Sequence, residues 1–448
     1  MLPLFALLVT TMTSTSALNN GLALTPAMGY SSWNDCASQI TEERVKNITN
    51  HMISSGLAAK GYIHINIDEG WLKARNNSTG ALMEDLDKFP SGMKALGEWV
   101  HNQVVPGKGK IMKYGLYTCR GNCQCSTQQY QGPGGQGFEA QDSAWLADAG
   151  ADYVKIDSCC GSQDHTTAFN DYGKWRDGMN KTGREMYLSL CGWNTWYAPV
   201  GDKLGNSWRI AGDGTNWGAL SNCINLNSKL QQYASLGGWN DPDLLQGTGI
   251  GSNDLATNPS GCYVAKSIPQ AKGWYQTELQ SRAQFSMWAI MSAPLLISAD
   301  VGQVSNYSLE TWSNEEIIQV SQTFRRGGPY QGSRLVGGDL NFGKVEGGGW
   351  TGSGHNVWGK LLPGGDFALV FVSNEDTLTN ITCDVTCFQL LGVEGSLQLK
   401  FTVRDLWKHS TLQNNFTSPF TFTAHNIPIH GGVAMYRFTL VRKYTLVQ

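Results

Sequence analysis

Residues 152–157 read DYVKID, a short β-like run that ends in an acidic residue, and this stretch decides the fold class. The preceding residues 138–152, FEAQDSAWLADAGAD, carry a helical pattern that ends at a glycine. A helix that leads directly into a strand is half of a repeating βα rhythm. We therefore expect an α/β fold built from such units.

The same rhythm runs from residue 24 to about residue 300. Helical patterns lie at 41–56, where Thr41 is placed as an N-cap and Gly56 as the end, and at 279–294. The strand-like runs lie at 25–33, 62–71, 111–119, 152–157, 186–193, 207–213, 236–245 and 293–300. Eight βα units are what a (β/α)8 TIM barrel requires, so we predict one over residues 18–328.

The pattern changes after about residue 330. Short alternating runs at 366–374, 396–407 and 432–441 are separated by Gly, Asn and Pro. This predicts a separate C-terminal antiparallel β-sandwich domain over residues 329–448.

Composition excludes several classes of partner. The formal net charge of the 448 residues is -3, and neither Lys nor Arg clusters anywhere, so we expect no nucleic-acid partner.

Residues 1–17, MLPLFALLVTTMTSTSA, are typical of a signal peptide, and no later segment reaches the ~20 apolar residues of a membrane span.

Cysteines and glycosylation sequons also indicate an extracytoplasmic protein. Eleven cysteines predict disulfides, and their odd number leaves at least one thiol unpaired within the monomer. Acceptor sequons begin at Asn47, Asn76, Asn77, Asn180, Asn306, Asn380 and Asn415. We expect a glycosylated protein that is secreted or sent to a lysosome or vacuole.

Almost every predicted strand ends in a carboxylate with an aromatic residue nearby. The acidic residues are Asp68, Glu69, Asp157, Asp213, Asp241 and Asp243. The aromatic residues are Trp33, Trp71, Tyr117, Trp193 and Trp239. Carboxylates bind sugar hydroxyls and aromatic rings pack on the sugar's C–H face, so we predict a sugar site at this end of the barrel. No strand end offers a His-rich ligand set, so we expect neither metal nor cofactor.

These segments resemble glycoside hydrolase family 27, the α-galactosidase (melibiase) and α-N-acetylgalactosaminidase family. The matching motifs are GLALTPAMGYSSWN (21–34), INIDEGW (65–71), KYGLYTC (113–119), DYVKIDSC (152–159), SWRIAGD (207–213), GGWNDPDLL (237–245) and SMWAIMSAPLLISAD (286–300). The resemblance implies a retaining exo-glycosidase that releases terminal α-D-galactosyl residues. It makes Asp157 the nucleophile and Asp213 the general acid/base. We expect Lys155 to hold the pKa of Asp157 down.

The resemblance also assigns the sugar-binding residues and some of the disulfides. The binding residues are Trp33, Asp68, Glu69, Tyr117, Lys155, Arg209 and Asp243, with Asp243 supporting the acid/base region. Cys383 would pair with Cys387, and Cys159 with Cys123 or Cys125. Homodimers are common in the family, so a homodimer stays open.

Three departures from the family pattern leave the substrate and some of the cysteine pairings open. Glu69 stands where most members have a second aspartate, and its extra methylene could crowd the galactose hydroxymethyl group, which a β-L-arabinopyranoside lacks. Gly192 replaces a glutamate that recognises the C2 hydroxyl and leaves room for an acetamido group, as in α-N-acetylgalactosaminidases. Cys36 and Cys191 lack their usual partners and would be free or differently paired. A catalytically silent galactose-binding protein is the alternative from another class.

Overall fold

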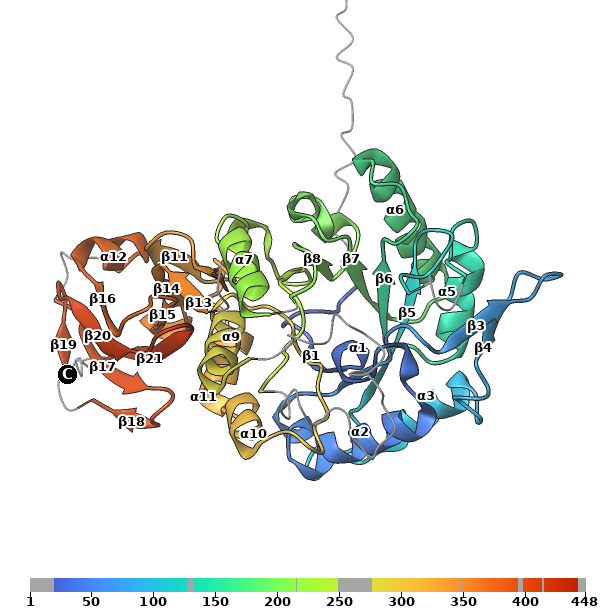
Figure 1. Ribbon diagram of the computed structural model, residues 1–448, viewed down its shortest axis with the longest axis horizontal. Helices are drawn as coiled ribbons and strands as arrows, with labels where there is room; N and C mark the ends of the chain where they lie inside the picture. The colour runs from blue at the N-terminus through green and yellow to red at the C-terminus, as the bar shows by residue number, and fades with distance from the viewer. Residues whose placement is uncertain are drawn as a thin grey trace, which may run out of the picture.

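The computed structural model describes residues 20–126, 133–214, 216–248, 276–345, 349–393, 398–412 and 415–441. The expected signal peptide therefore lies outside the described residues. Within these ranges the chain forms a parallel barrel followed by an antiparallel β domain (Figure 1). No helix in the described ranges is both long and apolar enough to cross a membrane.

Eight parallel strands form the barrel, hydrogen-bonded in the order β10-β1-β2-β5-β6-β7-β8-β9. Their bounds are β1 Met28–Ser31, β2 His64–Asn66, β5 Lys113–Cys119, β6 Tyr153–Asp157, β7 Tyr187–Cys191, β8 Ser207–Arg209, β9 Trp239–Asp241 and β10 Leu295–Ile297. Beyond β9, Leu245 bridges Ile297 in parallel and closes the circle. Each observed strand lies inside one of the eight predicted runs, which confirms the (β/α)8 fold.

Helices connect and surround these strands. Their bounds are α1 Trp33–Cys36, α2 Glu42–Ser54, α3 Met93–Asn102, α5 Glu139–Asp148, α6 His165–Lys181, α7 Trp217–Asn227, α9 Glu278–Ile290, α10 Asn306–Trp312 and α11 Glu315–Gln322. The Thr41 side chain caps α2 by accepting a hydrogen bond from the Arg44 amide at 3.3 Å, as the sequence predicted. A short hairpin of β3 Leu72–Arg75 and β4 Leu82–Glu84 follows β2.

The C-terminal domain is a β-sandwich. One sheet runs β11-β14-β15-β21-β17-β18 with β19 paired to β17, and a second sheet pairs β16 with β20. The bounds are β11 Ser333–Val336, β12 Asn341–Lys344, β13 Trp350–Ser353, β14 His355–Leu361, β15 Phe367–Ser373, β16 Thr379–Cys383, α12 Val385–Leu390, β17 Lys400–Asp405, β18 Ser410–Thr411, β19 Phe416–Thr417, β20 Phe422–Ile427 and β21 Gly432–Leu440. Apolar side chains from both sheets form its core, including Phe371 on β15 and Phe422 on β20.

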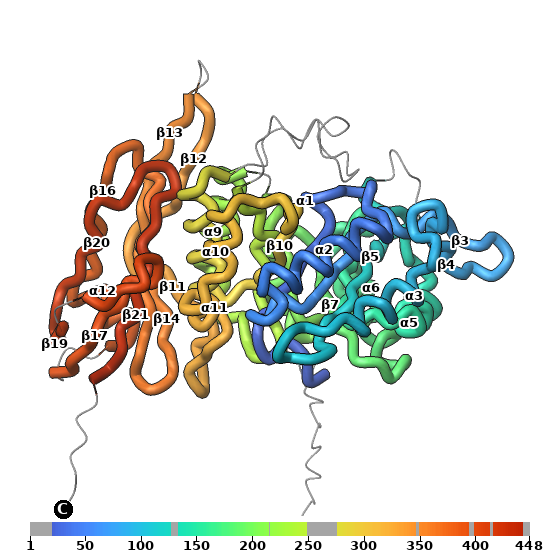
Figure 2. Tube along the Cα trace, turned by 90° about the horizontal axis from the view of Figure 1, so that it is seen from below, coloured from blue at the N-terminus to red at the C-terminus, as the bar shows by residue number. Residues whose placement is uncertain are grey.

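The two domains pack directly on each other. Helix α9 contacts β15 and β21, and α7 contacts β12. Figure 2 shows α9 and α11 between the barrel and the β domain. The apolar core of the barrel continues into this contact, where Trp288 and Met435 belong to one buried cluster. The β domain thus covers one flank of the barrel and leaves the ends of the strands free.

Candidate active site

A cavity of about 350 Å³ lies at the carboxyl ends of the barrel strands. It is lined by all nine residues to which the sequence assigned catalysis or sugar binding. These are Trp33, Asp68, Glu69, Tyr117, Lys155, Asp157, Arg209, Asp213 and Asp243. The barrel therefore brings together residues from six strand ends that lie up to 210 positions apart in the chain.

Asp157 ends β6 on the floor of the cavity and is buried. Its carboxylate accepts a hydrogen bond from the Ser158 amide at 3.0 Å. Lys155 lies two residues earlier on the same face of the strand, with its Nζ 2.8 Å from Asp68 and 3.8 Å from Asp157. The ammonium thus lies between two carboxylates, where it can also donate to a sugar hydroxyl.

The electrostatics of Asp157 differ from the sequence expectation. Burial raises the pKa of Asp157 above its ordinary value, and the nearby charge of Lys155 lowers the pKa without reversing the shift. Lys155 therefore lowers the pKa of Asp157 as expected, but desolvation of the carboxylate outweighs this attraction, so the net shift is upward. For Lys155, burial lowers the pKa, but Asp68 and the other neighbours raise it well above its usual value.

Arg209, at the end of β8, lines the cavity and binds two of its carboxylates. Its Nη2 lies 2.9 Å from Asp243 and 3.2 Å from Asp213. Asp243 also accepts a hydrogen bond from the Gly214 amide at 2.7 Å, directly beside Asp213. Burial raises the pKa of Asp243 to about 6 against the opposing effect of Arg209. Asp243 thus supports the segment that carries Asp213.

The two candidate catalytic carboxyls differ strongly in exposure. The Asp213 side chain is 64% exposed, whereas that of Asp157 is 8% exposed. A solvent-accessible carboxyl can exchange protons with water, and a buried one is shielded for attack on a bound group. The arrangement can therefore separate proton transfer from nucleophilic attack.

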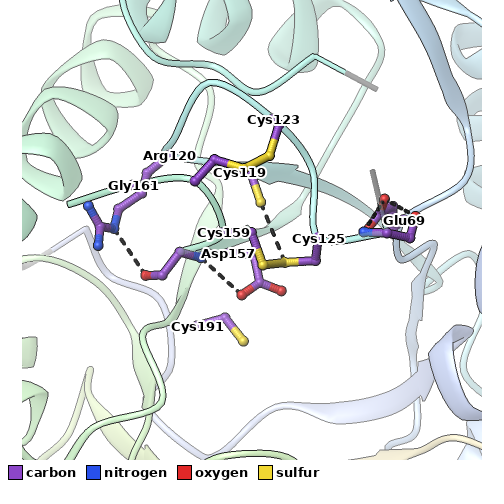
Figure 3. The surroundings of a disulfide bond; sticks show 12 residues. Glu69, Cys119, Arg120, Cys123, Cys125, Asp157, Cys159, Gly161 and Cys191 are labelled. Carbon is purple, nitrogen blue, oxygen red and sulfur yellow. Dashed lines mark hydrogen bonds between the residues drawn. A yellow bond between two sulfur atoms is a disulfide. The ribbon is translucent and has the colours of Figure 1, made fainter. Parts of the chain in front are cut away.

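Glu69 is held by a residue that sequence reasoning missed. The Ser126 amide donates to Oε1 and Oε2 of Glu69 at 3.0 and 3.1 Å, and the Ser126 hydroxyl also donates to Oε1. The Tyr117 hydroxyl donates to Oε2 at 3.3 Å. Figure 3 shows Glu69 beside the loop that carries Cys123 and Cys125. No local signal marks Ser126, because the contact spans 57 residues of sequence.

Two disulfides tie this loop to the residues that follow Asp157. Cys125 pairs with Cys159, one of the two options left by the sequence, and Cys123 pairs with Cys160. Cys383 pairs with Cys387 in the β domain. Of the two cysteines that the sequence left open, Cys36 is disulfide-bonded and Cys191 is a free buried thiol that lines the cavity.

Among the described residues, one group of side chains lies close enough together to hold a metal ion, and its ligand atoms are all sulfurs. Cys119, Cys125 and Cys159 lie with their ligand atoms within 4.8 Å of one another. Two of these three sulfurs are joined in a disulfide (Figure 3) and are not thiolate ligands. The Cys119 thiol lies 3.8 Å from the Cys125 sulfur.

Gly192 does not leave the space that the sequence predicted. A Cβ atom added to Gly192 would lie 1.9 Å from Cε2 of Tyr197, so this ring packs directly on the glycine. Tyr197 is buried, and neither residue lines the cavity. Tyr197, five positions further along the chain, therefore fills the space that a side chain at position 192 would occupy.

Some residues singled out in the sequence lie outside the cavity. Asp241, Trp71 and Trp239 are buried, and the two indoles donate to backbone carbonyls. Trp193 does line the cavity and adopts a positive φ of 55°. Asn34 and Gln246 line it as well. They had no distinguishing signal, since neutral amides at loop positions are common.

Comparison with known proteins agrees with this geometry. A family model described as alpha galactosidase A matches residues 25–266 and 273–323, and one described as the alpha galactosidase C-terminal beta sandwich domain matches residues 352–438. Alpha-galactosidase 2 of Arabidopsis thaliana is 33% identical over 401 residues, covering 88% of this chain and 85% of that one. The rice alpha-galactosidase is 31% identical, covering 88% and 81%.

A solved structure shares the fold over nearly the whole chain. Alpha-galactosidase I from Mortierella vinacea superposes with a TM-score of 0.75 at 26% identity, covering 94% of this chain and 98% of that one. Both domains of the present chain therefore have counterparts of known type. The chain belongs to glycoside hydrolase family 27, the α-galactosidase (melibiase) family.

Proposed function

We propose that the protein is a retaining α-galactosidase that removes terminal α-D-galactosyl residues from oligosaccharides, glycans or glycolipids. The observation that carries the proposal is one cavity in which a buried carboxyl, Asp157, and an exposed carboxyl, Asp213, stand on different strand ends among sugar-binding side chains. The plant relatives named alpha-galactosidase, at 31–33% identity over most of the chain, support the choice of sugar.

The reaction is a double displacement. The Asp157 carboxylate attacks the anomeric carbon while the bond from that carbon to the leaving oxygen breaks, and Asp213 gives this oxygen its proton. Water then attacks the galactosyl ester of Asp157, Asp213 takes a proton from the water, and the ester bond breaks. Two inversions return the original anomeric configuration.

The surroundings of the two carboxyls favour this division of roles. Lys155 lies 3.8 Å from Asp157 and favours its ionised form, which is the form that attacks. Asp213 reaches solvent, so it can recover its proton between cycles. When Asp157 is esterified its negative charge disappears, and Asp213, which has already given up its proton, can take one from the attacking water.

The same family suggests β-L-arabinopyranosidase activity as a second candidate. Glu69 is the observation that favours it, because its longer side chain lines the cavity. A β-L-arabinopyranosidase from Geobacillus stearothermophilus has the same fold, with a TM-score of 0.73 at 19% identity. The buried Tyr197 ring against Gly192 argues against an acetamido substrate.

Steady-state kinetics on p-nitrophenyl glycosides test the proposal. We expect kcat/KM for the α-D-galactopyranoside to exceed that for the β-L-arabinopyranoside and the α-N-acetylgalactosaminide. Asp157→Asn should lower it by about 10³-fold or more, because an amide cannot form the ester. Binding of galactose to Asp157→Asn should persist. A wild type that binds galactose and turns over none of these substrates would instead be a catalytically silent binding protein.

We also propose that the protein passes through the secretory pathway to the medium, a lysosome or a vacuole. All seven sequon asparagines are exposed, and the described chain contains disulfides. N-terminal sequencing of the mature protein should begin at Leu18, and an endoglycosidase should increase its gel mobility. A mature chain that begins at Met1 and carries no glycan would contradict this route. Sedimentation analysis of the purified protein tests the homodimer that the family resemblance leaves open.

A further inference from the structure

Glu69 lines the cavity and is bound by a residue of a loop that is tied down by disulfides. Four hydrogen bonds fix its carboxylate: three from the amide and hydroxyl of Ser126 and one from the Tyr117 hydroxyl. Both carboxylate oxygens are therefore bound by protein, and the side chain is drawn toward the loop at 121–126. A carboxylate that accepts this many hydrogen bonds is strongly oriented.

The loop that carries Ser126 has a fixed position relative to Asp157. Cys125, next to Ser126, is joined to Cys159, and Cys123 is joined to Cys160 (Figure 3). Cys159 is only two residues beyond Asp157. The distance between the attacking carboxylate and the residue that holds Glu69 is thus set by a covalent connection.

Strand order determines which part of the sugar Glu69 faces. Asp157 is at the end of β6, where the anomeric carbon must lie for attack, and Glu69 follows β2. These strands are separated by β5, so their ends are about 10 Å apart at two strand spacings. Glu69 therefore faces the ring atoms farthest from the anomeric carbon. In a galactopyranoside this end carries the exocyclic hydroxymethyl group, which an arabinopyranoside lacks.

We propose that Ser126 is a positioning residue that sets the sugar specificity by holding Glu69 against the loop. The inference rests on the proposed glycosidase function. In the restrained position the glutamate leaves space for the hydroxymethyl group, and its carboxylate oxygens stay turned toward the loop at 121–126. Without the Ser126 hydroxyl, only the Ser126 amide and the Tyr117 hydroxyl restrain the carboxylate. The side chain, one methylene longer than an aspartate, then turns more readily into the cavity and occupies that space.

The test compares kcat/KM for the α-D-galactopyranoside with kcat/KM for the β-L-arabinopyranoside in the wild type and four variants. Ser126→Ala should lower the galactoside-to-arabinoside ratio about tenfold, mainly through a higher KM for the galactoside. Glu69→Asp shortens the side chain and should suppress this effect, so Ser126→Ala/Glu69→Asp should lie within about threefold of Glu69→Asp alone. Ser162→Ala, in an exposed turn outside the cavity, is the matched control and should keep the wild-type ratio.

The inference would be overturned if Ser126→Ala left the galactoside-to-arabinoside ratio unchanged. It would also be overturned if the double variant, compared with Glu69→Asp alone, lost as much of this ratio as Ser126→Ala loses compared with the wild type. A wild type that prefers the arabinoside would also overturn it. Calorimetric binding of D-galactose and L-arabinose to Asp157→Asn, with and without Ser126→Ala, measures the same ratio without turnover. If turnover is absent but this binding ratio shifts, the proposed hydrolase function fails while the role of Ser126 stands.

Discussion

At the scale of single residues, burial and the charge of Lys155 have opposite effects on the ionisation of Asp157. Burial raises the pKa of this carboxyl and Lys155 lowers it. Other groups also face Asp157 from the neighbouring strand ends, and all of them disfavour its charge or are neutral donors. They are Asp68, Glu69, Tyr117, Cys119 and Cys191. Lys155 is therefore the main source of stabilisation for the ionised nucleophile.

Replacing Lys155 with methionine should make the pKa of Asp157 rise further. Activity needs ionised Asp157, so activity exists above this pKa and is lost as the pH falls through it. We expect the acidic limb of the kcat/KM profile to move up by about one pH unit, equivalent to about 1.4 kcal/mol, along with a lower plateau from the lost sugar contact. Lys174→Met, at an exposed position on α6, is the control and should leave the limb in place. A limb that stays or moves to lower pH in Lys155→Met would contradict this electrostatic role.

At the scale of elements, the paired disulfides connect one active-site loop to another. Cys125–Cys159 spans 34 residues of sequence and Cys383–Cys387 spans 4. The cost of losing a disulfide grows with the length of the closed loop. Of these two bonds, Cys125–Cys159 lies near both Asp157 and Ser126 and Cys383–Cys387 lies in the β domain, so we expect loss of the first bond, and not of the second, to change catalysis.

The variant Cys125→Ser/Cys159→Ser should lose about 2 kcal/mol of unfolding free energy, because Cys123–Cys160 still closes nearly the same loop, and should lose most of its kcat/KM. Cys383→Ser/Cys387→Ser should lose about 2 kcal/mol and keep its kcat/KM. Thermal unfolding and p-nitrophenyl galactoside kinetics on both variants provide the comparison. Equal losses of activity in the two variants would show that the first disulfide has no special relation to the site.

Local patterns explain why the elements were predictable, and the family resemblance supplied the nine cavity residues. Strand ends such as YVKID show the period-two alternation, and the Thr41 cap lies beside its own helix. The residues that could not be predicted act across the fold. Ser126 binds Glu69 over 57 positions, and the ring of Tyr197 fills the space at Gly192 only because the chain turns there. The net pKa shifts could not be predicted from the sequence either, because they depend on how deeply each group is buried.

At the scale of the whole molecule, the β domain supports the helix that follows the Asp213 segment. The Trp217 indole at the start of α7 donates to the side-chain oxygen of Asn374 at 2.8 Å. The amide nitrogen of Asn374 donates to Ser221 at 3.0 Å. All three side chains are buried. Asn374, just after β15, thus connects the β domain to the catalytic face of the barrel.

Asn374→Ala should lower the unfolding free energy by about 1–3 kcal/mol, because it leaves a buried indole N–H and a buried hydroxyl without their partner. We expect a lower Tm by calorimetry and a smaller effect on kcat/KM. Asn341→Ala, at an exposed position on β12, is the control and should unfold within about 0.5 kcal/mol of the wild type. An unchanged Tm in Asn374→Ala would show that this contact does not join the domains.

The most direct test of the central claim is covalent trapping of the glycosyl-enzyme. A fluorinated α-galactosyl fluoride that forms the ester faster than water cleaves it should add one galactosyl group to the intact protein, and peptide mapping by mass spectrometry should place it on Asp157. Asp157→Asn should stay unlabelled. A label on a different carboxylate, or turnover in Asp157→Asn at the wild-type rate, would contradict the assignment of Asp157 as the nucleophile of a retaining α-galactosidase.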